Sequence, residues 1–148
     1  MSTIENLPPD AADALKAFTS TGWVQFVGLE ILEFGGDGVT VRWTVGADHW
    51  QPYGIVHGGV YCTVIETVAS LAGAAWFGER GHVVGVSNQT DFLRATREGV
   101  LTAVGTPVHR GRLQQLWQVE ISDAGGRTVA RGQVRLQNIA SAEGLGRS

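Results

Sequence analysis

The stretch His57-Gly58-Gly59-Val60-Tyr61-Cys62-Thr63-Val64-Ile65-Glu66-Thr67-Val68-Ala69-Ser70-Leu71-Ala72-Gly73-Ala74-Ala75-Trp76-Phe77 decides the fold. After Gly59 it is apolar or weakly polar throughout, its pattern is helical, and Glu66 is its only charge. A helix that is apolar on every side must be enclosed by other elements. A carboxylate inside it is costly unless it is paired or used. Glu66 is therefore the first candidate for a catalytic residue.

The segments around this helix alternate apolar and polar residues, which indicates strands buried on one face. Turns rich in glycine separate several of them, as in Gly35-Gly36-Asp37-Gly38. We expect a short helix over 8–19 and strands over 23–34, 39–45, 83–93, 100–108, 113–122 and 127–138. Strands of this kind, joined by short turns, form an antiparallel sheet that needs a cover on one face. The predicted fold class is α+β, a curved antiparallel sheet wrapped around one long central helix.

Length and charge narrow the possibilities further. The 148 residues fit a single domain over 1–148, with a core at about 23–138 and a frayed tail over 141–148. The net charge of −3 gives no basic field for nucleic acid or an anionic membrane. Cys62 is the only cysteine, and the histidines lack metal-ligand spacing, so neither an internal disulfide nor a metal site is expected. The first residues carry no signal pattern, which favours a cytoplasmic protein.

The start of the long helix offers a second chemical group. Gly58 and Gly59 leave backbone N–H groups open to a substrate oxygen, where the helix dipole favours negative charge. Gly58 and Glu66 are separated by roughly 12 Å along a helix, too far for both to act on one carbonyl. An antiparallel second copy would bring Glu66 of one chain to Gly58 of the other. Because one sheet also leaves part of the helix uncovered, we predict a homodimer with shared active sites, and a tetramer is compatible with this arrangement.

The face of the helix around Glu66 is made of small residues, which leaves room for a ligand or for a closely packed helix. They lie three, four or seven positions away: Gly59, Cys62, Thr63, Ala69, Ser70 and Gly73. The structural alternative is an ordinary packing face, in which a backbone N–H satisfies Glu66.

The motif Gln51-Pro52-Tyr53-Gly54-Ile55-Val56-His57-Gly58-Gly59, followed by Glu66, resembles the hotdog-fold acyl-CoA thioesterases. The similarity covers about residues 24–138 and continues through Phe92-Leu93-Arg94 and Gln115-Leu116-Trp117-Gln118-Val119-Glu120-Ile121. It is strongest to the branch with the 4-hydroxybenzoyl-CoA, phenylacetic-acid-degradation and 1,4-dihydroxy-2-naphthoyl-CoA thioesterases. The resemblance implies hydrolysis of an aryl-CoA thioester. Coenzyme A is then part of the substrate, and no separate cofactor is needed.

The resemblance also implies roles for five residues. Glu66 matches the catalytic carboxylate, acting as nucleophile or as general base for water, and Ser70 matches the hydroxyl that helps to position water. Gly58 matches the glycine whose N–H holds the thioester oxygen, and Gln51 the amide near that carbonyl or the water. His57 matches the histidine that shapes the loop. Phe92 departs from the menaquinone-type members, which often carry His there, so a contact to a ring hydroxyl is less expected.

Other residues have weaker patterns. Four could bind the phosphates of coenzyme A or could be ordinary surface charges: Arg94, His109, Arg110 and Arg112. Four aromatic residues could line an acyl pocket or pack in the core: Trp50, Tyr53, Trp76 and Phe77. Two other functions stay open, a hydratase or dehydratase on the same fold and a non-catalytic acyl-CoA binding or sensor protein. The hydratases usually carry Pro-Gly before the helix, and the intact Glu66 argues against a sensor.

Overall fold

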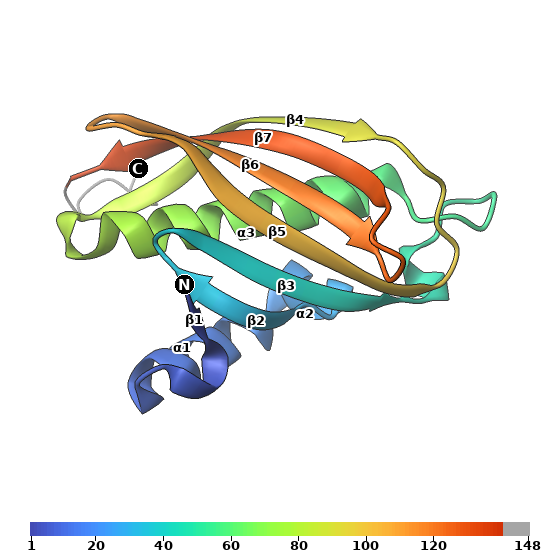
Figure 1. Cartoon of the computed structure of the whole chain (residues 1–148), viewed down its shortest axis with the longest axis horizontal. Helices are drawn as coiled ribbons and strands as arrows, with labels where there is room; N and C mark the ends of the chain where they lie inside the picture. Colours follow the sequence, from blue (N-terminus) through green and yellow to red (C-terminus); the bar gives the residue numbers. More distant parts are fainter. Residues whose placement is uncertain (141–148) are drawn as a thin grey trace.

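The computed structural model describes residues 1–140 and shows a curved antiparallel sheet wrapped around one long helix (Figure 1). Neighbouring strands follow the order β1-β2-β3-β5-β6-β7-β4. The strands are β1 Ser2–Thr3, β2 Glu30–Gly35, β3 Gly38–Val45, β4 His82–Phe92, β5 Gly99–Arg110, β6 Gln114–Asp123 and β7 Thr128–Ile139. The helices are α1 Pro9–Thr19, α2 Gly22–Val27 and α3 Gly58–Phe77, with 3-10 turns η1 Ile4–Asn6, η2 Ala47–His49 and η3 Gly78–Arg80. The predicted fold class is confirmed, and the tail predicted over 141–148 lies outside the described residues.

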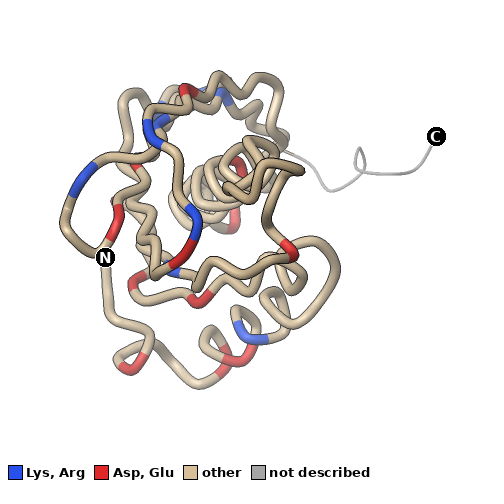
Figure 2. The backbone as a smooth tube through the Cα atoms, turned by 90° about the vertical axis from the view of Figure 1, so that its right-hand side faces the viewer, with Lys and Arg blue, Asp and Glu red and all other residues tan. Residues whose placement is uncertain are grey.

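Glycines let α3 pack closely against the sheet, which curves around it when the molecule is viewed along the helix (Figure 2). A Cβ on Gly105 of β5 would stand 2.6 Å from Cγ1 of Val68, and one on Gly132 of β7 would stand 3.1 Å from Cγ2 of Ile65. On the helix itself, a Cβ on Gly73 would overlap the side chain of Leu136. The missing side chains therefore set how deeply α3 sits in the sheet.

A buried amide fixes the C-terminal half of α3 to the sheet. The side chain of Gln115 is fully buried, accepts a hydrogen bond from Trp117 Nε1 at 2.7 Å and donates to Asn138 Oδ1 at 2.7 Å. Its Nε2 also donates to the carbonyl of Gly73 at 3.3 Å. Because every one of these polar groups is paired, the network ties α3 to β6 and β7 without an uncompensated desolvation cost.

The strand predicted over 23–34 is wrong in its first half. Residues Gly22–Val27 form α2, and β2 begins only at Glu30. Gly28 ends the helix with φ of 76° and donates its N–H to the carbonyls of Val24 and Gln25. A left-handed glycine of this kind is a typical C-terminal stop for a helix. Trp23 and Phe26 are spaced as neighbours on a helix and stack with ring centroids 4.9 Å apart.

The remaining predicted elements are confirmed with small shifts at their ends. The helix over 8–19, the strand over 39–45 and the four strands after residue 82 all form. The short β1, which pairs with β2, was not predicted. The segment Gly58–Arg80 is long and apolar enough to cross a membrane, but half of it is buried within the fold, as in a core helix.

One face of α3 and one edge of the sheet stay open. Along that face, four residues around Glu66 are only half-buried: Cys62, Thr63, Thr67 and Ser70. Ala69 and Gly73, expected on the same small face, are instead buried against the sheet. Strand β4 pairs only with β7 among the described strands, so its outer edge is unpaired. An apolar helix and a free strand edge side by side form a surface that proteins usually cover.

Candidate active site

The N-terminus of α3 is prepared by His57. Its ring Nδ1 accepts the N–H of Gly59 at 2.8 Å, and its own backbone N–H donates to the carbonyl of His49 at 2.8 Å. The neighbouring N–H of Gly58 makes no hydrogen bond to any described residue. His57 therefore satisfies one of the orphan donors of the helix start and leaves Gly58 available.

Gln51 is oriented by the loop that precedes the helix. Its Oε1 accepts the N–H of Tyr53 at 2.5 Å, and its backbone N–H donates to the carbonyl of Ile55 at 2.8 Å. Gly54, with φ of 74°, closes this tight turn. With the amide oxygen engaged, the Nε2 group has no hydrogen-bond partner within residues 1–140 and is the free end of the side chain. Both Gln51 and Gly58 thus present donors, not acceptors.

These two donors line one cavity of about 310 Å³. The other lining residues are mostly apolar: Ile55, Val56, Tyr61, Phe92, Leu93, Arg94 and Ala95. The Phe92 ring lies over Gly58, since its Cε2 and Cζ would be 2.6 Å from a Cβ at that position. A side chain at position 58 would therefore meet this ring, whereas glycine lets a substrate oxygen approach the N–H beside an aromatic wall.

Tyr61, one turn after Gly58, is 3% exposed. Its hydroxyl has no hydrogen-bond partner among the described residues. Burial raises the pKa of Tyr61 above its ordinary value of 10.0, and the nearby Thr96 side chain, whose contact with the hydroxyl falls short of hydrogen-bond geometry, opposes this in part. A buried hydroxyl without a partner keeps a desolvation cost that an apolar residue would avoid.

Glu66 lies on the half-buried face of α3 and does not line this cavity. Its Oε2 accepts a hydrogen bond from Asn88 Nδ2 at 3.1 Å. Its Oε1 lies against Gly85, where a Cβ would overlap it. The carboxylate is thus turned toward β4. Ser70 follows one helical turn later on the same side.

The structure therefore separates the predicted catalytic residues into two groups. Gln51, His57 and Gly58 lie together around the N-terminus of α3, whereas Glu66 and Ser70 lie further along the helix. The separation of roughly 12 Å expected from the helix rise is retained, because α3 is continuous from Gly58 to Phe77.

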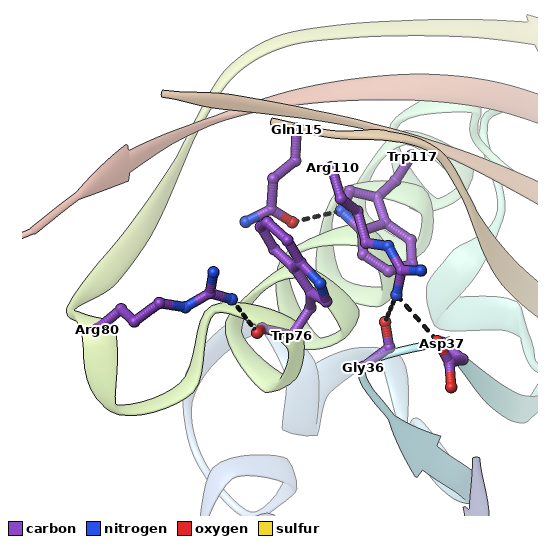
Figure 3. Close-up of polar contacts among 7 residues, drawn as sticks. All are labelled: Gly36, Asp37, Trp76, Arg80, Arg110, Gln115 and Trp117. Carbon is purple, nitrogen blue, oxygen red and sulfur yellow. Dashed lines mark hydrogen bonds and ion pairs between the residues drawn. The ribbon is translucent and has the colours of Figure 1, made fainter. Parts of the chain in front are cut away.

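The predicted phosphate-binding residues are not together. Arg94 lines the cavity, but the other three lie in or beyond the end of β5, near the C-terminus of α3. There Arg110 donates to the carbonyl of Gly36 at 2.8 Å and pairs with Asp37 at 2.9 Å (Figure 3). The hydrogen bond from Arg110 to the Asp37 carboxylate also lowers the pKa of Asp37. Arg110 thus connects the β2–β3 turn to the sheet.

The predicted aromatic residues are also divided between the two ends of α3. Trp50 donates its Nε1 to the carbonyl of Arg97 at 2.8 Å, and Tyr53 is 85% exposed. Trp76 is covered by two guanidinium groups, those of Arg80 at 4.3 Å and Arg110 at 5.7 Å from its ring centre (Figure 3). Trp76 therefore has a packing role. The aromatic rings that do line the cavity are those of Tyr61 and Phe92.

Asn88 is the polar neighbour of Glu66 that sequence patterns did not identify. Regular alternation along β4 would place Asn88 on the same face as Val86 and Thr90, away from Gly85. A β-bulge between Gly85 and Ser87 changes this alternation. The residue types in Val84-Gly85-Val86-Ser87-Asn88 do not predict the bulge.

Comparisons with known proteins agree with this architecture. The family model of the thioesterase superfamily matches residues 53–130. The crystal structure of AziG from S. sahachiroi is 50% identical, covers 82% of this chain and 98% of its own, and superposes with a TM-score of 0.80. The thioesterase HI1161 from Haemophilus influenzae is 31% identical, with coverage of 98% and 99% and a TM-score of 0.85. The 1,4-dihydroxy-2-naphthoyl-CoA hydrolase of Escherichia coli is 32% identical over 115 residues, 78% of this chain and 85% of that protein.

The matched segment begins two residues after Gln51 and contains the rest of the loop from Tyr53, the helix N-terminus and Glu66. The chain therefore belongs to the thioesterase superfamily, and its sheet and helix form the hotdog fold of that family. It is an enzyme of the thioester hydrolase class.

Proposed function

We propose that the protein is an acyl-CoA thioesterase that hydrolyses aryl-CoA thioesters in active sites shared between two copies of the chain. The observation that carries this proposal is the division of the site. Two free donors, on Gln51 and Gly58, meet in one cavity, while Glu66 is held outside that cavity and further along the same helix.

The donors suit the electrophilic half of the reaction. A thioester carbonyl in the cavity would receive the Gly58 N–H at the positive end of α3 and the Nε2 of Gln51. Both hydrogen bonds would strengthen as negative charge develops on the carbonyl oxygen, and this lowers the barrier to nucleophilic attack. The His57 ring accepts the N–H of Gly59, so the N–H of Gly58 is the donor that stays free for the substrate.

Glu66 supplies the nucleophilic half from the partner chain. As a general base it accepts a proton from water while the water oxygen attacks the carbonyl carbon. The carbon–sulfur bond then breaks and the thiolate of coenzyme A takes up a proton. As a nucleophile it attacks the carbonyl carbon and expels the thiolate of coenzyme A, and water then hydrolyses the resulting anhydride to release the acid and restore the carboxylate. Ser70, one turn away, is placed to hold the water in either route.

A homodimer supplies the geometry that one chain lacks. Two antiparallel copies of α3, joined along the free edge of β4, would cover the half-buried face and place each Glu66 beside the other chain's Gly58. Two such dimers could assemble further into a tetramer without changing the site.

The substrate class follows from the cavity and from the family. Tyr61 and Phe92 lie against each other in the cavity lining, with ring centroids 6.0 Å apart and ring planes tilted by 37°, and the remaining lining is mostly aliphatic. A flat aryl group would pack against the open side of this aromatic pair. The relative from Escherichia coli, named as a dihydroxynaphthoyl-CoA hydrolase, supports an aryl-CoA. Arg94 at the cavity is the cation best placed for a phosphate of coenzyme A, and such a substrate implies a cytoplasmic enzyme.

A thiol-release assay tests this function. Dihydroxynaphthoyl-, hydroxybenzoyl- and phenylacetyl-CoA should exceed palmitoyl-CoA in kcat/KM. Glu66→Gln preserves volume and should reduce hydrolysis by at least roughly 100-fold, while the fold and substrate binding survive. Near-normal turnover by the Glu66→Gln variant would reject the mechanism, and palmitoyl-CoA as the best substrate would reject the aryl preference.

A further inference from the structure

We infer that Asn88 is a positioning residue for the reaction: it holds the Glu66 carboxylate in one orientation, and a β-bulge in β4 places it there. The inference rests on the proposed role of Glu66 and deepens it. Asn88 touches neither the cavity nor a second catalytic residue, so its effect would act through Glu66.

The hydrogen bonds around Asn88 define its orientation. Its Nδ2 donates both to Glu66 Oε2 and to the carbonyl of Cys62, each at 3.1 Å. Its Oδ1 accepts the hydroxyl of Thr90 at 2.7 Å. Because the oxygen is engaged by a donor and the nitrogen by two acceptors, the amide is fixed with its N–H groups toward the carboxylate.

The bulge explains how a strand can aim two residues three positions apart at one side chain. Gly85 pairs with Leu136 and Ser87 with Arg135, so Val86 is the extra residue. In a regular strand, positions 85 and 88 would point to opposite faces. With the bulge, Gly85 lies against Glu66 Oε1 and Asn88 binds Oε2, so that both oxygens meet β4. Bulges are common beside active sites for this reason.

A carboxylate on a long side chain needs such fixation. Glu66 has three rotatable bonds and lies on an open helix face, so it would otherwise sample several rotamers. A displacement of about 1 Å at a catalytic group can reduce a rate by roughly 100-fold.

Substitution of Asn88 tests the inference through kcat. Asn88→Ala removes the donor, and Asn88→Asp keeps the size but replaces the donor with an acceptor. We expect each to lower kcat by about 10- to 100-fold, the range for a lost hydrogen bond to a charged group, with KM changed less than about threefold. Thr90→Val removes only the hydrogen bond from the Thr90 hydroxyl to the Asn88 amide oxygen, and it should lower kcat by a few-fold. Gln89→Ala is the matched control, because Gln89 lies on the outer face of β4, beside Gln133.

A double-mutant cycle separates positioning from folding. In a Glu66→Gln background, Asn88→Ala should cause no further loss, since the group it positions is gone. Additive losses, or a fall in kcat with a matching fall in melting temperature, would overturn the inference. The inference would also be overturned if Asn88→Asp and Thr90→Val kept the wild-type kcat while Glu66→Gln was inactive. That result would leave the proposed function intact. An active Glu66→Gln variant would instead reject the function itself.

Discussion

His57 and Gly59 are joined by a hydrogen bond of 2.8 Å from the Gly59 N–H to the ring Nδ1, and this bond decides which donor of α3 stays free. The histidine is an N-cap as well as a member of the motif. Because its Nδ1 is an acceptor, the neutral ring carries its proton on Nε2.

His57→Ala should therefore affect stability and activity together. Loss of an N-cap costs about 1 kcal/mol, which lowers the melting temperature by about 2–4 °C in a protein of this size. The Gly58 N–H remains, so kcat should fall less than it does in Glu66→Gln. Thermal unfolding and the thiol-release assay measure the two effects. A stable His57→Ala variant as inactive as Glu66→Gln would show that the ring acts in the chemistry.

Tyr61→Phe should stabilise the protein, because it removes a buried hydroxyl that has no partner among the described residues. The expected gain is about 1 kcal/mol near neutral pH. Since the folded state raises the pKa of Tyr61 above 10.0, the unfolded state loses the proton first as pH increases. Stability should thus fall from about pH 10 upward in the wild type. Denaturant titrations at pH 8 and pH 11 check this. A variant that is less stable at pH 8, or equally sensitive to high pH, would contradict it.

Much of the fold can be predicted from the sequence, because its periodicities are strong. The apolar run after Gly59 gives α3, and alternation such as Val39, Val41 and Trp43 gives the strands around it. Helix α2 could not be distinguished from the start of a strand, since a few apolar residues fit both periods until Gly28 is known to adopt a positive φ.

The candidate site can be predicted from the sequence where it lies in one contiguous segment, and not where tertiary geometry decides which residues meet. Gln51, His57, Gly58 and Glu66 belong to one motif. The contact of Asn88 with Glu66 depends on the bulge in β4, and that bulge depends on how β4 pairs with β7. Arg110 has the charge of a phosphate ligand, but it forms a salt bridge with Asp37. This salt bridge could not be predicted from the sequence, because it depends on the fold bringing the β2–β3 turn next to the end of β5.

Cys62 offers a direct chemical test of the proposed helix pairing. It lies midway between Gly58 and Glu66, so an antiparallel pair that matches these two residues would bring the two Cys62 side chains together at the twofold axis. Cys62 is a half-buried free thiol in the described chain. Mild oxidation or a short bis-maleimide should produce a covalent dimer on denaturing gels. The Cys62→Ser variant is the control, and a chain that stays monomeric under both reagents would exclude close pairing at this point.

The most direct test of the shared site is complementation between two inactive variants. Gln51→Ala and Glu66→Gln each damage every site in their own homodimers. In a mixed dimer, one site combines intact Gln51 and Gly58 of one chain with intact Glu66 of the other. Purified mixed dimers should therefore recover activity well above either variant, up to about half of the wild-type rate if the sites are independent. Verified mixed dimers without any recovery, or an active enzyme that sediments as a monomer, would contradict the account.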